Sequence, residues 1–264
     1  MPANLAKRKL RAGQVVLGHS VFEFATPGIT RILEGAGADF VSFDMEHAAF
    51  GIDTVRRLIS YSRGTTVSPF VRVPTLRYEY IAGVLDVGAQ GIWVPMVETL
   101  DDVERVVDAA RYPPAGGRGI AYGIAHDDYL PGDPVEKMRE ANQEVLLTAM
   151  IETARGLDNL EEIASHPELD MIWIGHYDLA ASLGVPGDIK HPRMLEAFAR
   201  LVSVGRKFDK FVGRGIGDAD GAVEWIGKGF QALTYSRDIS LFQRTLAREL
   251  AEVRERADPS RLHR

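Results

Sequence analysis

Short apolar runs alternate with longer segments of helical spacing along nearly the whole chain. The apolar runs are bounded by polar residues, glycine or proline, a pattern that is typical of parallel strands buried on both faces. Eight such strands are predicted, over residues 15–17, 40–43, 69–73, 91–94, 145–151, 171–174, 211–213 and 230–235.

Helices are predicted between these strands. Thr99 is a good N-cap for one of them, because Asp101 and Asp102 follow in its first turn. Only residues 112–143 break the alternation, and we expect a functional loop there with a short helix over 135–141. The other predicted helices cover residues 27–36, 52–63, 78–85, 100–111, 155–165, 194–208, 222–228 and 239–256.

The regular alternation predicts parallel strands joined by right-handed crossovers. Eight strand–helix repeats in 264 residues, with no change of composition between the halves, favour a single (β/α)8 barrel over residues 1–264. A hydrophobic content of 45% and a charged content of 26% fit a globular protein with a sizeable core.

Composition excludes several classes of function. A net charge of −6 gives no general attraction to nucleic acid or to an anionic membrane. The absence of cysteine excludes disulfides, thiolate metal ligands and cysteine nucleophiles. The first residues are basic but lack the apolar core of a signal peptide, and no apolar run approaches the ~20 residues that span a bilayer. A cytoplasmic protein is therefore expected.

The carboxyl ends of the predicted strands carry the candidate site, as in other barrel enzymes. Glu152 and Asp178 each follow a buried strand, one strand–helix repeat apart. Two such carboxylates can hold a hard divalent cation that a substrate shares. Alternatively, Glu152 caps the next helix and Asp178 begins another. The other strand-end residues are His19, Asp44, Glu46, His47, Arg72, Pro95, Arg214 and Tyr235.

Arg72 lies within an otherwise apolar strand, so its guanidinium needs an anionic partner. That partner is either a core acid such as Asp44 or Glu46, or a substrate carboxylate or developing oxyanion. His47 is a candidate base at neutral pH, or an ordinary loop histidine. Asp86 follows a helix and, on sequence alone, is a helix-end or turn residue. Strand ends carry no lysine, which disfavours a Schiff-base mechanism.

Several short motifs occur in a specific order between residues 7 and 250. They are Asp44-Met45-Glu46-His47, Val71-Arg72-Val73-Pro74, Leu85-Asp86-Val87-Gly88-Ala89, Val94-Pro95-Met96-Val97, the stretch 111–119, Ile151-Glu152-Thr153 and Gly175-His176-Tyr177-Asp178. Together they resemble the HpcH/HpaI family of metal-dependent class II pyruvate aldolases.

The resemblance implies a role for each motif. Glu152 and Asp178 would bind Mg²⁺, Mn²⁺ or Co²⁺. Asp44 and Glu46 would lie around these two ligands without binding the metal themselves. The backbone around Gly175, Tyr177 and Asp178 would hold the carboxylate of a 2-oxoacid. Arg72 would stabilise the enolate oxygen, and His47, paired with Asp86, would manage the proton. The resemblance also implies a homo-hexamer in which the last helix, with its stripe of apolar residues, is swapped between subunits. Packing on its own barrel is the alternative for that helix.

The chain departs from the family pattern at three places. Met150 replaces a common glutamine, His176 and Tyr177 replace smaller residues before Asp178, and the segment after the first strand lacks a tryptophan often found there. His19 and Glu23 in that segment are candidates to touch the acceptor substrate or to lie behind it.

Three functions are open from the sequence. The first is reversible aldol addition of a 2-oxoacid enolate, from pyruvate or hydroxypyruvate, to an aldehyde. The second is decarboxylation of oxaloacetate, or carbon–carbon bond formation coupled to it. The third is a non-catalytic barrel that serves as a binding or assembly module. The set Glu152, Asp178, Arg72 and His47 favours an enzyme over the third.

Overall fold

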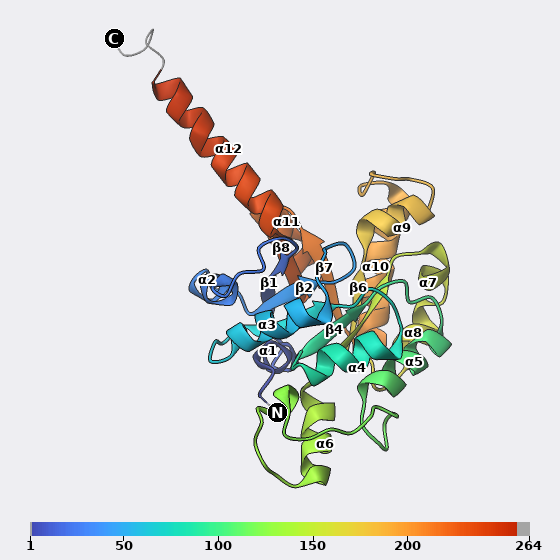
Figure 1. The fold of residues 1–264 in the computed structure, drawn as a ribbon. Helices are drawn as coiled ribbons and strands as arrows, with labels where there is room; N and C mark the ends of the chain where they lie inside the picture. Colours follow the sequence, from blue (N-terminus) through green and yellow to red (C-terminus); the bar gives the residue numbers. More distant parts are fainter. Residues whose placement is uncertain (1, 258–264) are drawn as a thin grey trace.

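Eight parallel strands close into a barrel in the computed structural model, which describes residues 2–257 (Figure 1). Each strand pairs with the next in the chain, and β8 pairs with β1 to complete the ring. The predicted (β/α)8 fold is therefore confirmed. The strands are β1 (Val16–Val21), β2 (Phe40–Asp44), β3 (Ser68–Arg72), β4 (Gly91–Val94), β5 (Leu146–Ile151), β6 (Met171–Ile174), β7 (Phe211–Ile216) and β8 (Ala232–Arg237).

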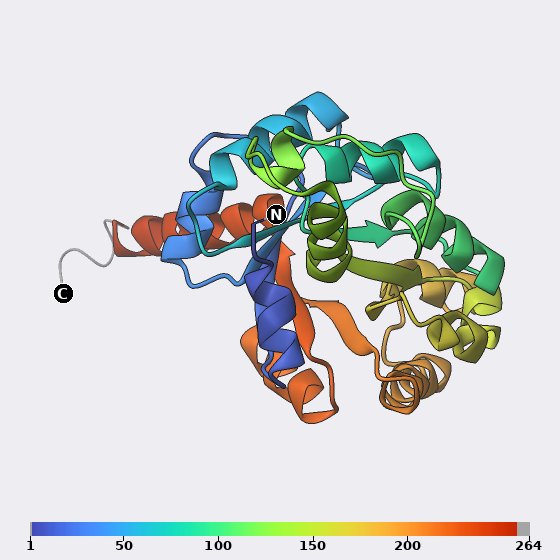
Figure 2. The same cartoon turned by 90° about the horizontal axis from the view of Figure 1, so that it is seen from below.

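Helices surround the barrel, as the view from below also shows (Figure 2). Thr99 caps α5 as predicted, forming a capping box with Asp102. The helices are α1 (Leu5–Arg11), α2 (Ile29–Gly35), α3 (Ile52–Ser62), α4 (Tyr78–Asp86), α5 (Leu100–Ala110), α6 (Pro134–Glu144), α7 (Ala154–Asp158), α8 (Leu160–Ser165), α9 (His176–Ser182), α10 (Pro192–Lys207), α11 (Ala219–Gly227) and α12 (Asp238–Arg256), with a 3₁₀ turn at Ala125–Asp127.

Three helical details differ from the sequence prediction. The single helix expected over 155–165 is divided into α7 and α8 at Asn159. The short helix α9 begins directly after β6 and is absent from the predicted helices, although a helix start at Asp178 was the alternative from sequence. Helix α1 was not predicted, because its basic residues mask two buried apolar positions, Ala6 and Leu10.

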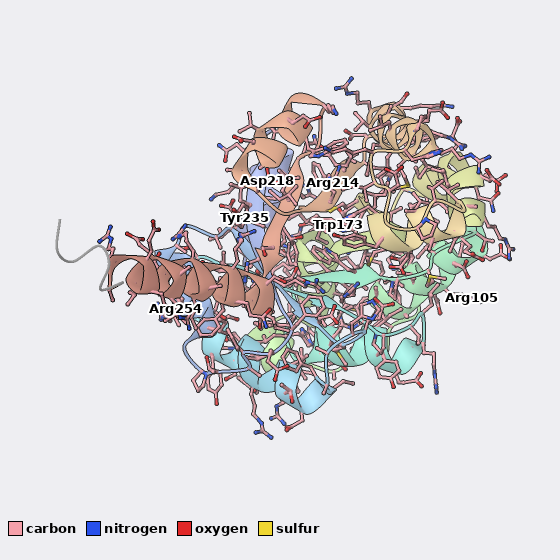
Figure 3. The ribbon with its side chains drawn as sticks, turned by 90° about the horizontal axis from the view of Figure 1, so that it is seen from above. Arg105, Trp173, Arg214, Asp218, Tyr235 and Arg254 are labelled. Atoms are coloured by element: carbon pink, nitrogen blue, oxygen red, sulfur yellow. The ribbon has the colours of Figure 1, made fainter. Side chains whose placement is uncertain are left out.

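Aromatic rings fill the inside of the barrel. Phe40 stacks on Phe70 with 5.1 Å between ring centroids, and Trp93 stacks on Trp173 at 4.2 Å. Figure 3 labels Trp173 near the middle of the ring of strands. Gly213 faces this layer, and a Cβ there would lie 2.2 Å from Trp173. The interior is thus a packed core, and chemistry is left to the strand ends.

Helix α1 is fastened to the amino-terminal end of the barrel by a buried charge cluster. Lys7 is 2% exposed, and its Nζ lies 2.7 Å from Asp170 Oδ1 and donates to the carbonyl of Val145 at 2.7 Å. Arg111 also pairs with Asp170, at 3.0 Å. Burial lowers the pKa of Lys7 from 10.5 to about 8, although Asp170 opposes the shift.

Lys7 should make stability depend on alkaline pH. Between pH 8 and 10.5 the unfolded chain holds a proton that the folded chain has released. The free energy of unfolding should therefore rise across this window, by up to about 3 kcal/mol. In Lys7→Met, where Asp170 keeps Arg111, this rise should be smaller, and what remains includes the contribution of Lys210, whose pKa burial also lowers. Urea unfolding of both proteins at several pH values measures the effect. If the free energy of unfolding changed with pH in the same way in both proteins, Lys7 would not be its source.

Helix α12 projects away from the barrel (Figure 1). Near its start Phe242 meets Phe24 edge to face at 5.6 Å, but further along Leu246, Leu250 and Val253 are 42%, 43% and 61% exposed. Packing of the whole helix on its own barrel, the alternative from sequence, is therefore wrong. No helix in residues 2–257 is long and apolar enough to cross a membrane.

Candidate active site

Glu152 is a buried carboxylate at the carboxyl end of β5. It is 3% exposed, and its Oε1 accepts a hydrogen bond from the Met96 amide at 2.7 Å. Met96 adopts a left-handed backbone conformation, with φ at 56°, while its amide donates to Glu152. Gly175, after β6, leaves room on the other side, because a Cβ there would lie 2.1 Å from Oε2. Both neighbouring strand ends thus shape the place of one carboxylate.

Burial raises the pKa of Glu152 to about 7, although the Met96 amide opposes the shift. The charges of Glu46 and Asp178 raise it further, so these acids lie within electrostatic reach. The pKa of Glu46 is raised too, mainly by burial, against the pull of Arg72. Such crowding of carboxylates disfavours their charged forms until a cation arrives.

Arg72 ends β3 beside β2, in register with Asp44. Its Nε donates to Asp44 Oδ2, and its Nη1 lies 3.0 Å from Glu46 Oε2 as an ion pair. Asp44 is 1% exposed, and its Oδ1 accepts from the amide of His47 at 2.6 Å. The core acids proposed from sequence as partners of Arg72 are therefore its partners, and they hold it at the mouth.

His47 and Asp86 are not joined within residues 2–257 of this chain. The His47 side chain is 56% exposed, with Nε2 at 3.6 Å from Glu46 Oε2. Asp86 Oδ1 accepts instead from Arg118 Nη2 at 2.6 Å. Arg118 is 2% exposed and stacks on Tyr112, so this buried cation requires an acid nearby. Sequence reasoning missed this pair because Arg118 belongs to a glycine-rich loop.

The first turn of α9 brings three predicted residues to the mouth. Asp178 is exposed, and Tyr177 is 64% exposed with its ring 4.4 Å from that of His176. Burial and the nearby Arg214 lower the pKa of His176 to about 4, so this imidazole is neutral at physiological pH. Met150 points into the apolar barrel interior and is 3% exposed.

Arg214 does not reach the mouth, although it was among the strand-end residues. It points outward and is 3% exposed, with its guanidinium 3.8 Å from the ring centre of Trp225 and 4.3 Å from that of Phe198. Figure 3 shows it away from the centre of the barrel. Because positions alternate along a strand, Gly213 and Gly215 face inward while Arg214 faces the helices.

His19 and Tyr235 lie on the opposite side of the mouth from Glu152, on β1 and β8. His19 Nδ1 is 2.7 Å from the Tyr235 carbonyl, so its ring is tied to the backbone. Glu23 is exposed just beyond β1. These residues form a part of the rim without a carboxylate pair.

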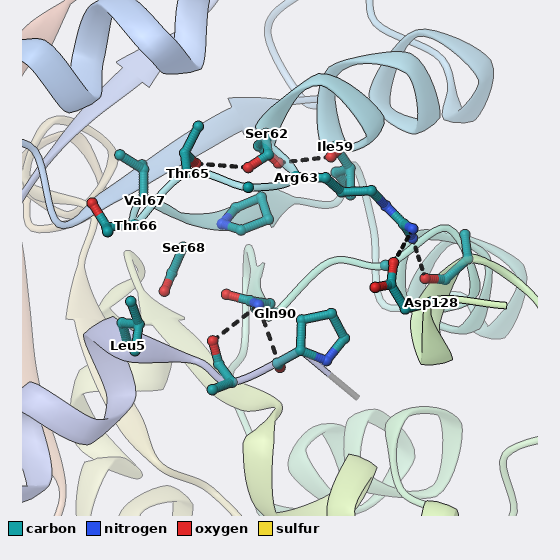
Figure 4. A pocket seen from close by; sticks show the side chains of 16 residues that line it. Leu5, Ile59, Ser62, Arg63, Thr65, Thr66, Val67, Ser68, Gln90 and Asp128 are labelled. Carbon is teal, nitrogen blue, oxygen red and sulfur yellow. Dashed lines mark hydrogen bonds and ion pairs between the residues drawn. The ribbon is translucent and has the colours of Figure 1, made fainter. Parts of the chain in front are cut away.

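A cavity of about 260 Å³ lies at the other end of the barrel (Figure 4). Its lining includes Ser68 and Gln90, near the starts of β3 and β4, together with Thr65 and the amino-terminal residues Pro2 and Ala3. None of the predicted site residues lines it. The predicted site residues therefore lie away from this cavity, at the carboxyl end, where Asp44, Glu46 and Arg72 converge.

Fold and site together define a barrel enzyme with an acidic mouth built around an arginine. A sequence profile of the HpcH/HpaI aldolase/citrate lyase family matches residues 22–243. The chain belongs to this family, as the resemblance predicted, and is a carbon–carbon lyase of the aldolase type.

Curated relatives and solved structures agree with this assignment. The chain is 35% identical over 250 residues to 4-hydroxy-2-oxovalerate aldolase of Novosphingobium aromaticivorans, covering 89% of this chain and 92% of that protein. It is 35% identical over 209 residues to hydroxypyruvate/pyruvate aldolase of Roseovarius nubinhibens, covering 78% and 80%. An HpcH/HpaI aldolase from Desulfitobacterium hafniense has the same fold, with a TM-score of 0.90 at 28% identity over 94% and 96% of the two chains.

Asp44 should be essential for the architecture of the mouth. Asp44→Ala leaves the buried Arg72 and the amide of His47 without their acceptor, so the free energy of unfolding should fall by ~3–5 kcal/mol. Asp44→Asn keeps an acceptor for the amide and should lose less. Urea unfolding measures both, and values within ~0.5 kcal/mol of wild type would show that Asp44 does not organise the site.

Proposed function

We propose that the protein catalyses the reversible addition of a 2-oxoacid enolate, from pyruvate or hydroxypyruvate, to an aldehyde. The observation that carries this proposal is the position of Arg72, a nearly buried cation at the mouth within electrostatic reach of Glu152. Its side chain is 12% exposed, and Asp44 and Glu46 fix its orientation. Family membership and the aldolase names of the relatives support the reaction class, and they weigh against a non-catalytic barrel.

We propose that Glu152 and Asp178 hold a divalent metal ion, Mg²⁺, Mn²⁺ or Co²⁺. The residues fit such an ion, because the acids crowd together and burial raises the pKa of Glu152 in the absence of a cation. Residues 2–257 contain no group of three or more histidines and acids placed to hold a metal. The proposed ion would have two protein ligands, and substrate and water would supply the others. When bound, the ion would act as a Lewis acid toward the 2-oxoacid.

The proposed task of Arg72 is to stabilise charge at the keto oxygen. This oxygen carries little charge in the ketoacid and much more in the enolate, so the interaction with the guanidinium strengthens toward the transition state. Asp44 and Glu46 prevent Arg72 from turning away, and they need no movement during the reaction. The backbone at Gly175, Tyr177 and Asp178 is proposed to hold the substrate carboxylate.

His47 is proposed to transfer the proton, directly or through water. Its exposed ring lies at the mouth, and its backbone amide is anchored by Asp44. Asp86 ends α4 just before β4 begins, at the opposite end of the barrel from the mouth, and Arg118 holds one of its oxygens. The proposed pairing with His47 therefore requires Asp86 of a second subunit, and the Asp86 side chain is 38% exposed for such a contact. His47→Ala should lower the aldol rate while leaving metal binding intact.

Glu152→Gln should weaken metal binding at least 100-fold, because the variant loses an anionic ligand while Gln can still accept from Met96. Calorimetric titration with Mn²⁺ measures this, with Glu136→Gln, an exposed change on α6, as the matched control. Wild-type affinity in Glu152→Gln would place the ion elsewhere.

Arg72→Ala should reduce both aldol cleavage and oxaloacetate decarboxylation by about 10²–10³ in rate, because both reactions pass through the same enolate. Arg72→Lys keeps the charge but loses the planar fork, and should recover only part of the activity. Steady-state assays of pyruvate release and of CO₂ release compare the two reactions. If one of the two reactions kept its wild-type rate, the proposal of a shared enolate stabilised by Arg72 would be wrong.

We also propose a homo-hexamer in which α12 is swapped between subunits. The exposed stripe of Phe242, Leu246, Leu250 and Val253 supports a covered face, since isolated apolar stripes on a projecting helix are costly in water. Leu246→Glu with Leu250→Glu should dissociate the assembly, and Arg248→Glu on the same helix is the control for added charge. Light scattering tests this, and a wild-type monomer at micromolar concentration would refute the proposal.

A further inference from the structure

The ring of Phe22 is close to two guanidinium groups at the β1–β8 side of the mouth. The Cζ of Arg72 is 5.6 Å from the ring centre, and the Cζ of Arg237 is 5.3 Å from it. Phe22 directly follows β1, and Arg237 ends β8 in register with Ser20. A second arginine thus lies near the proposed enolate site, close to the same aromatic ring as Arg72.

The backbone on both sides of Arg237 is constrained. Ser236 has φ at 60°, a left-handed conformation that a non-glycine residue adopts only when its surroundings impose it. The pairing of β1 with β8 also shifts register between Gly18 and Ser20. On the other side, Asp238 is 4% exposed and accepts hydrogen bonds from the amides of residues 22–24. Arg237 therefore leaves β8 at a fixed place and in a fixed direction.

The two arginines differ in how their charges are balanced. Arg72 is paired with Asp44 and Glu46. Arg237 is exposed, and no carboxylate among the described residues lies within ion-pair distance of it; its guanidinium lies over the ring of Phe22. Arg72 is already balanced by its two acids, so Arg237 offers an anionic group on the acceptor a cation with no competing carboxylate among the described residues.

We propose that Arg237 determines specificity by binding an anionic group, a carboxylate or a phosphate, on the acceptor aldehyde. This inference rests on the proposed aldol reaction and names the class of its second substrate. The guanidinium presents a planar fork to such oxygens. Phe22 holds that fork flat and offers an apolar surface to the carbon chain between the aldehyde and its anionic end. The bond-making steps are unchanged, because Arg237 touches the far end of the acceptor.

Matched acceptors test the assignment in the full-length enzyme with Mn²⁺ and pyruvate. Butanal is compared with 4-oxobutanoate, in which a carboxylate replaces the terminal methyl group, and glyceraldehyde with glyceraldehyde 3-phosphate. Arg237→Met should lower kcat/KM about 10- to 100-fold for an anionic acceptor and leave its neutral counterpart within about threefold. Arg237→Lys should retain part of the preference. Arg105→Met, which removes an exposed charge from α5 on a distant side of the barrel, should not alter it (Figure 3).

The outcomes separate the possibilities. A loss on 4-oxobutanoate alone, on the phosphate alone or on both supports the inference and identifies the anion. Equal losses on neutral and anionic acceptors, or no loss on either anion, would overturn it. A wild-type enzyme that joins pyruvate to none of the four aldehydes would overturn the proposed function as well, and this failure is recognisable before any variant is made.

Discussion

The ion pair between Arg72 and Asp44 is the interaction on which the rest of the site depends. Asp44 ends β2 and Arg72 ends β3, and the two positions are in register across the sheet. One carboxylate oxygen of Asp44 holds the guanidinium, while the other holds the amide that starts the loop of His47. Parallel pairing of two strands therefore places an arginine beside an acid, and the acid in turn anchors the loop that carries His47.

The burial of Glu152 is a second constraint on the site. A carboxylate that is 3% exposed is costly in an apolar surrounding, and one amide bond from Met96 offsets only part of that cost. The part of this cost that is not offset appears as the raised pKa of Glu152. The buried carboxylate thus lowers the stability of the fold at a position where a bound cation would restore it. Such destabilised positions are common at functional sites. The aromatic interior and the α1 charge cluster at the other end supply rigidity.

Much of this arrangement could be predicted from the sequence. Buried parallel strands read as continuous apolar runs, so β4 and β6 were placed to the residue, and Glu152, Asp44 and Arg72 could be placed at strand ends. Contacts between distant segments could not be predicted. Arg118 takes an oxygen of Asp86 from a loop 32 residues away, and Arg214 faces aromatic helix residues because of strand alternation, a detail that requires the exact strand phase. The strained turn at Ser236 leaves no signal in composition at all.

The central claim is that this mouth makes and stabilises an enolate, and exchange of the pyruvate methyl protons in D₂O tests it most directly. No aldehyde is needed, so the measurement isolates enolate formation from acceptor binding. With Mg²⁺ present, proton NMR should show the methyl signal of pyruvate disappearing with wild-type enzyme, and at least about 100-fold more slowly with Arg72→Ala. Exchange at the same rate in both proteins would contradict the account.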